Sequence, residues 1–74
     1  MDNIEYNTLK YAFILEYLIK RESFFINEYK IKLVNELLKI NINYAYILNM
    51  ENNELLNELS KITNEYFVKI DLNE

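Results

Sequence analysis

The sequence of 74 residues contains no glycine, proline, cysteine, histidine or tryptophan. Without cysteine and histidine, the chain lacks the residues that form disulfides, most zinc sites and the commonest catalytic base. Without glycine and proline, turns must be built from other residues, and asparagine tolerates left-handed backbone geometry best among them. These absences argue against metal, redox and nucleophilic chemistry and favour helices joined by short polar turns.

Part of this composition reflects codon usage rather than function. Asparagine, isoleucine, lysine, tyrosine and phenylalanine have A/T-rich codons, whereas alanine occurs only at Ala12 and Ala45 and arginine only at Arg21. The chain therefore has the composition of a protein from an AT-rich genome, such as a low-GC bacterium, its phages or plasmids, or a large DNA virus. The missing glycines alone do not indicate a function.

The length predicts a single helical domain over residues 1–74. Hydrophobic residues make up 51% of the chain, too many for a disordered protein. A domain this small buries only about 60% of its unfolded surface. Since no disulfide or Cys/His metal site can support it, we expect unusually apolar helix packing or oligomerisation.

Charge and hydropathy indicate where the protein acts. The apolar stretch 11–19 carries Glu16 and falls well short of the about 20 residues that span a membrane, so no membrane association is expected. No basic segment with a small-residue cleavage site is visible, so we expect a cytoplasmic protein. The net charge of −4 argues against direct binding of nucleic acid.

Hydrophobic periodicity predicts an all-α fold, a compact domain of three to four helices at about residues 3–21, 27–40 and 44–68. Asp2 and Glu5 resemble a capping box before the first helix, and Asn27 is the expected N-cap of the second. Residues 41–43 form the second turn, in which asparagine substitutes for glycine. A break near 49–53, with Asn52 or Asn53 as N-cap, is favoured over one continuous helix.

The C-terminal residues allow two readings. Residues 66–73 alternate apolar and polar side chains, which is strand periodicity and leaves open a winged-helix-like arrangement with residues 24–26. However, Ile62, Tyr66 and Ile70 also continue the helical stripe, so helix is the favoured interpretation.

The first helix has two apolar sides. One broad stripe is expected to face the core and consists of Ile4, Tyr11, Ile14, Leu15, Leu18 and Ile19. The opposite side carries Tyr6, Leu9, Phe13 and Tyr17, which a single three-helix core does not obviously cover. We therefore predict that this second side contacts a partner or another copy of the chain.

The third segment combines a heptad-like seam with an acidic ridge. The seam consists of Leu48, Asn52, Leu55, Leu59, Ile62 and Tyr66 and is a second candidate for dimerisation. The acidic ridge consists of Glu51, Glu54, Glu58 and Glu65. Residues 1–42 are neutral, so the whole net charge lies in residues 43–74. The ridge is either an ordinary solvated face or a docking site for a basic surface.

No catalytic, cofactor-binding or metal-binding residues are predicted, and we do not expect an enzyme. Glu54 and Glu58 are close enough to interact, but a small bundle leaves little room for the dry pocket that paired carboxylates require. The sequence predicts a non-catalytic protein-binding module, most simply a regulator or inhibitor of the phage or plasmid type. Its partner would present a basic surface, including the groove of a nucleic-acid-binding protein. A self-assembling structural subunit is the main alternative, and a degenerate helix-turn-helix regulator is disfavoured by charge.

Overall fold

The computed structural model describes residues 3–72, with the side chains of residues 4–68. The elements are α1 (Asn3–Lys20), α2 (Ile26–Leu38), the 3₁₀ helix η1 (Ile42–Asn49) and α3 (Asn52–Leu72). The predicted all-α fold of three to four helices is confirmed. The strand alternative is wrong, because α3 continues through residues 66–72 and no strand occurs within residues 3–72. The predicted capping box depends on Asp2, which lies outside the described residues.

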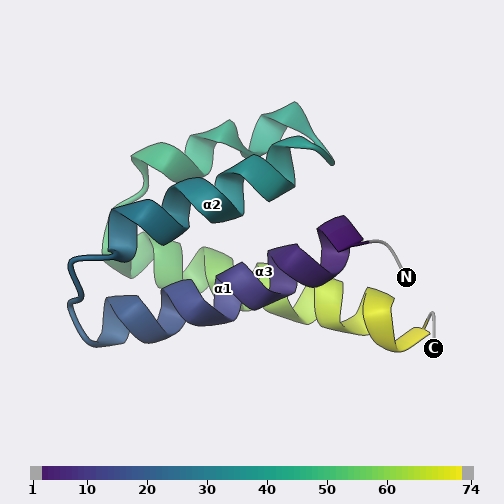
Figure 1. The fold of residues 1–74 in the computed structure, drawn as a ribbon, viewed down its shortest axis with the longest axis horizontal. Coiled ribbons are helices and arrows are strands. Elements are labelled where there is room, and N and C mark those ends of the chain that lie inside the picture. The colour runs from purple at the N-terminus through teal and green to yellow at the C-terminus, as the bar shows by residue number, and fades with distance from the viewer. Residues whose placement is uncertain (1–2, 73–74) are drawn as a thin grey trace.

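The helices are arranged around one central core (Figure 1). α1 packs against both α2 and α3, and α2 also packs against η1. α1 and α3 run in opposite directions, while η1 returns behind α2, so that the two ends of the chain lie at the same end of the molecule (Figure 1). α1 is therefore the element shared by the two main helix pairs.

The first turn is closed by a left-handed residue that is not glycine or asparagine. Glu22 has a φ of 52°, its N–H donates to the carbonyl of Ile19 at 3.1 Å, and the N–H of Ser23 donates to Leu18 at 3.1 Å. This pair of bonds is the Schellman motif, in which the residue after the helix adopts left-handed geometry. A side chain with a Cβ in this position costs about 1–2 kcal/mol.

Asparagine does not take the left-handed role predicted for residues 41–43. Asn41 has an extended backbone, with φ −157° and ψ 125°, and its Oδ1 accepts a hydrogen bond from the N–H of Asn43 at 2.9 Å. Asn41 therefore caps the start of η1 through its side chain. Its value to the turn comes from hydrogen bonding rather than from tolerance of positive φ.

The start of α2 also differs from the prediction. Phe25 occupies the N-cap position, its carbonyl accepts from the N–H of Tyr29 at 3.1 Å, and no side chain caps the helix. Instead, the hydroxyl of Ser23 accepts from the N–H of Phe25 at 3.1 Å. The prediction of Asn27 as N-cap is wrong, because the helix has already begun at Ile26.

The predicted break near 49–53 is confirmed. Met50 is extended, with ψ 141°, and the N–H of Leu55 donates to the carbonyl of Glu51 at 2.8 Å. The cap position is thus Glu51 rather than Asn52 or Asn53. The ammonium group of Lys30 on α2 donates to the carbonyl of Met50 at 3.2 Å and holds the break against α2.

The core is lined by one side of each helix. On α1 the fully buried positions include Thr8, Ala12 and Leu15, so the buried side is displaced from the predicted broad stripe toward small residues. The hydroxyl of Thr8 donates to the carbonyl of Ile4 at 2.7 Å, so its burial leaves no donor unpaired. Small side chains here allow α2 and α3 to approach α1 closely.

The heptad-like seam of the third segment lies inside the domain. Leu55, Leu59, Ile62 and Tyr66 are buried in the core with Leu33, Val34, Leu37 and Ile47. The first two residues of the seam are exposed: Leu48 lies in η1, and Asn52 is the first residue of α3. A dimer through this seam is therefore not available to the folded domain, and that prediction is wrong.

Candidate functional site

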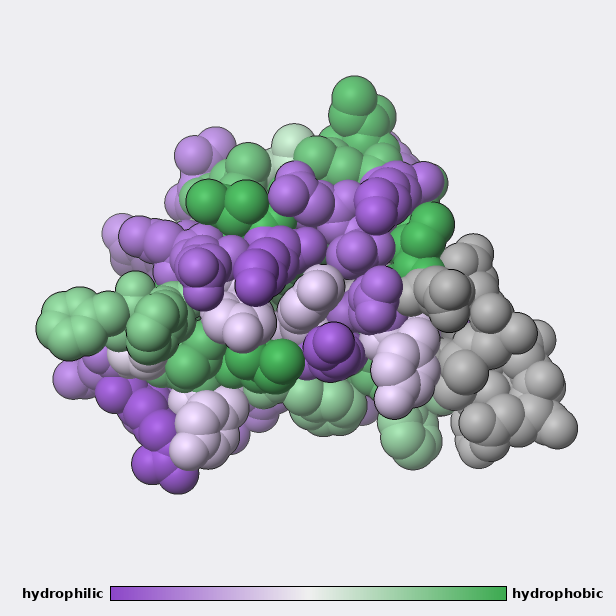
Figure 2. Space-filling view, viewed as in Figure 1, coloured by the Kyte–Doolittle hydropathy of each residue, from purple (hydrophilic) through white to green (hydrophobic). Residues whose placement is uncertain are grey.

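The second side of α1 points away from the core, as its sequence position predicts. Tyr6, Phe13 and Tyr17 are 52%, 51% and 56% exposed, and Leu9 is half-buried. We call these four residues the α1 outer face. Hydrophobic side chains lie along α1 and at the turn before α2, and again along the edge formed by η1, with a hydrophilic band over α2 between them (Figure 2). Large apolar side chains grouped in this way are typical of interaction surfaces.

Two shallow hollows lie on the α1 outer face. One, of about 350 Å³, is lined by Tyr6, Leu9, Lys10, Phe13 and Ile14. The second, of about 260 Å³, is lined by Phe13, Glu16, Tyr17 and Lys20. In each, four lining residues follow the spacing i, i+3, i+4, i+7. This is the spacing of the holes that receive side chains of a facing helix in coiled coils.

Charged groups around the α1 outer face are directed to partners on the same helix. The ammonium group of Lys20 lies 3.0 Å from Oε1 of Glu16. The guanidinium of Arg21 stacks over the ring of Tyr17, with its carbon 4.3 Å from the ring centre. The ammonium group of Lys10 lies 5.4 Å from the ring centre of Tyr11, so its aliphatic stem lines the first hollow. The face therefore offers an apolar centre with charges at its margins.

The acidic ridge begins at Glu51, just before α3, continues along α3 and contacts η1 through Glu58. Glu51, Glu54 and Glu65 are exposed, while Glu58 is half-buried and accepts a hydrogen bond from the hydroxyl of Tyr46 at 2.9 Å. Burial, and then the hydrogen bond to the Glu58 carboxylate, raise the pKa of Tyr46 to about 12. Glu58 thus connects α3 to η1. The acidic ridge is carried by α3 and by Glu51 before it, whereas the α1 outer face is carried by α1, so the two surfaces belong to different elements.

A second tyrosine is perturbed within the core. Tyr66 is 1% exposed, and its pKa is raised above the usual range by burial first and by a hydrogen bond with Tyr44 second. One carboxylate oxygen of Glu5 is buried without a hydrogen-bond partner, and its charge also raises the pKa of Tyr66. The neutral form of Tyr66 is therefore favoured, which suits a hydrogen-bond donor inside the core rather than an acid or base.

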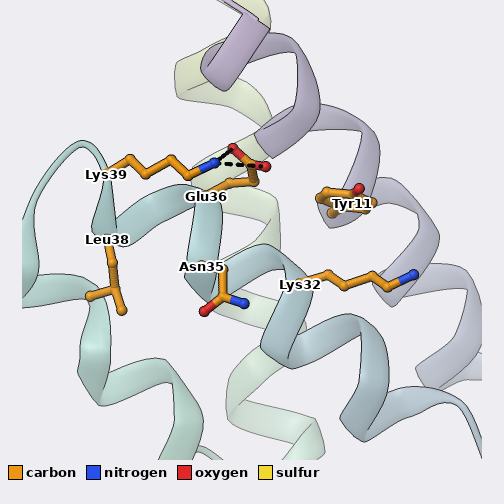
Figure 3. Close-up of a pocket in the computed structure, with 6 residues that line it drawn as sticks. All are labelled: Tyr11, Lys32, Asn35, Glu36, Leu38 and Lys39. Carbon is orange, nitrogen blue, oxygen red and sulfur yellow. Dashed lines mark hydrogen bonds and ion pairs between the residues drawn. The ribbon is translucent and has the colours of Figure 1, made fainter.

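A third hollow, of about 610 Å³, opens between α1 and α2 (Figure 3). Tyr11 reaches it from α1, and Lys32, Asn35, Glu36, Leu38 and Lys39 line it from α2 and the residue that follows. Lys39 lies 3.4 Å from Oε2 of Glu36, and Lys32 lies over the ring of Tyr29 at 4.7 Å. Its cations are thus already engaged within α2 and its C-cap, and the hollow gathers no convergent set of groups.

Sequence reasoning identified the α1 outer face and the acidic ridge but missed three features. The first feature is the pair of hollows, which are lined by Lys10, Glu16 and Lys20 as well as by the aromatic residues. The i, i+3, i+4, i+7 spacing of each set of four lining residues is visible in the sequence and could have predicted the hollows. The bond between Tyr46 and Glu58 had no local signal, because it joins two elements across the break. Phe24, in the turn before α2, is 102% exposed, although its neighbours gave no reason to expect complete exposure.

No group of three or more acidic side chains within the described part of the chain is placed to hold a metal ion, and no helix there has the length and hydropathy needed to cross a membrane. No family model, no curated protein and no solved structure matches this chain.

Proposed function

We propose that this protein is a non-catalytic protein-binding module whose main contact surface is the α1 outer face. The observation that carries the proposal is the exposure of Tyr6, Phe13 and Tyr17 on one side of a helix whose other side is in the core. With Leu9, they follow the spacing i, i+3, i+7, i+11, the pattern of helices that insert into apolar grooves. Tyrosine and other aromatic residues supply much of the binding energy at protein interfaces.

The acidic ridge has a separate role in this proposal. Glu51 and Glu54 are exposed on the part of the chain that holds the whole net charge of −4. A concentrated acidic flank favours encounter with a basic protein surface, and its effect falls as salt is added. The module would then act as a small regulator or inhibitor that occupies a partner's basic surface, with the apolar anchors on α1 providing affinity.

The test uses the full chain as bait in an extract of its source cells, followed by purification of the captured protein and titration calorimetry. Replacing Phe13 and Tyr17 by glutamate should weaken binding by about 10²-fold or more, since each anchor contributes on the order of 2 kcal/mol. Phe24→Glu is the matched control, because Phe24 is exposed but lies outside the α1 outer face. Unchanged affinity of the Phe13/Tyr17 variant would refute the proposed surface.

A second pair of variants tests the acidic ridge. Glu51→Lys with Glu54→Lys is preferable to any change at Glu58, because Glu58 accepts the hydrogen bond from Tyr46. The double reversal should slow association and reduce its dependence on salt while helicity is preserved. If the variant associates at low salt as fast as the original chain, the acidic ridge has no role in binding.

A further inference from the structure

We infer that the α1 outer face binds a second copy of this chain, with the two α1 helices antiparallel and each Phe13 seated in the first hollow of the other copy. This inference rests on the proposed use of the α1 outer face as a contact surface and adds a second copy of the chain as an occupant of that face. Its basis is the shape of the face, which carries both large side chains and the holes that fit them.

The spacing of side chains and holes makes the face complementary to itself. The first lining residues of the two hollows are Tyr6 and Phe13, so the hollows are seven residues apart. Tyr6 and Phe13 are also the aromatic side chains that would enter hollows of a facing copy, and their spacing therefore matches the spacing of the hollows. When Phe13 of one copy enters the first hollow of the other, the antiparallel register brings Tyr6 to the second hollow. The two-fold axis then repeats both contacts in the opposite direction. One register therefore fills all four hollows with aromatic side chains.

Electrostatics permit this approach. The Lys20–Glu16 pair leaves the second hollow without net charge, and the Lys10 ammonium group is drawn toward Tyr11. The net charge of −4 belongs to residues 43–74, whereas all residues that line the two hollows lie in α1. The contact itself therefore carries none of the acidic excess, and repulsion between the exposed acidic ridges is screened at physiological salt.

The area suggests a reversible dimer rather than a permanent one. A fully buried aromatic residue contributes about 150–250 Å², so three half-exposed aromatics on each copy bury roughly 500–700 Å² in total. Leu9 and the stems of Lys10 and Lys20 bring this near the lower limit of specific interfaces, about 1,000 Å². Association should therefore depend strongly on protein concentration.

Sedimentation equilibrium of the full chain from about 10 μM to about 1 mM covers the range of weak association. We expect a monomer–dimer equilibrium that Phe13→Glu weakens at least 10-fold and that Phe24→Glu leaves within two-fold, both variants retaining the circular dichroism of the original chain. A chain that stays monomeric throughout this range overturns the inference. The proposed function would survive that result if a different protein still bound the α1 outer face.

Disulfide formation tests the register separately, because the chain has no cysteine of its own. The antiparallel register places position 6 of one copy opposite position 17 of the other. A mixture of Tyr6→Cys and Tyr17→Cys chains should give the mixed disulfide at several times the yield of either self-linked species. A Phe24→Cys chain gives the background yield of disulfides that form by random collision. Self-linked Tyr6→Cys as the main product indicates parallel helices and overturns the inference.

Discussion

Glycine at position 22 should stabilise this protein. Glu22 closes α1 with a φ of 52°, a geometry that glycine adopts without steric cost. Relief of left-handed strain is worth about 1–2 kcal/mol. The added freedom of glycine in the unfolded chain offsets about 0.4–1 kcal/mol of this gain. The net effect of Glu22→Gly is thus about 0.5–1 kcal/mol of added stability, or a rise in Tm of about 2–8 °C for a domain of this size.

The assay is thermal and urea unfolding followed by circular dichroism, with two controls. Glu22→Ala removes a carboxylate that is unfavourable at a helix C-terminus but keeps the Cβ, so it should gain only the few tenths of a kcal/mol that the charge costs. Glu28→Gly places glycine in the first turn of α2 and should lower stability by about 0.5–1 kcal/mol. If Glu22→Ala stabilises as much as Glu22→Gly, the backbone argument is wrong and the charge explains the effect.

Two further predictions concern the core and the tyrosines. Leu59→Ala should cost about 3–5 kcal/mol because Leu59 is fully buried, which is much of the about 4–11 kcal/mol available to a domain of this length. Leu48→Ala, at an exposed position of the same heptad-like pattern, should cost less than about 1 kcal/mol by urea unfolding, and equal losses would contradict the core assignment. Because their pKa values are raised, Tyr46 and Tyr66 are more readily kept neutral in the folded protein than in the unfolded chain. The folding stability that they contribute is fully present below pH 10, and the contribution of Tyr46 is lost as the pH rises through about 12. Tyrosinate absorbance of the folded protein should therefore show late-titrating groups, one of which disappears in Tyr46→Phe; titration of all tyrosines near pH 10 would contradict the hydrogen bond to Glu58.

The helices and the α1 outer face were predictable because both follow from local periodicity. Leu55, Leu59, Ile62 and Tyr66 repeat at helical spacing whatever they contact, so the pattern identified a buried seam. It could not say whether the seam was buried by the same chain or by another. That distinction depends on α1 packing against α3 and on α2 and η1 completing the same core, which is tertiary information.

The turns were harder to predict because their geometry depends on neighbouring elements. Residue preferences favoured asparagine for positive φ, yet α1 ends where Leu18 and Ile19 present their carbonyls, and the residue in the left-handed position there is Glu22. The tertiary contact between Lys30 and Met50 likewise has no sequence signal, although it holds the break that the sequence correctly located. Preference identifies suitable residues, whereas packing decides which one is used.

The 3₁₀ form of η1 sets how far the chain travels on its return along α2. Eight residues at about 2.0 Å each extend about 16 Å, compared with about 12 Å for the same residues in an α-helix. Lys30 lies eight residues before Leu38, the last residue of α2, which is about 12 Å along the helix axis, so η1 covers the distance back to Lys30 with about 4 Å to spare. η1 is in this sense a spacer, and its hydrogen-bond pattern fixes where α3 can begin. A sequence change that converted it to α-helix would shorten the return path by about 4 Å, roughly one residue's reach, and would shift Met50 and the start of α3 by about that distance relative to Lys30.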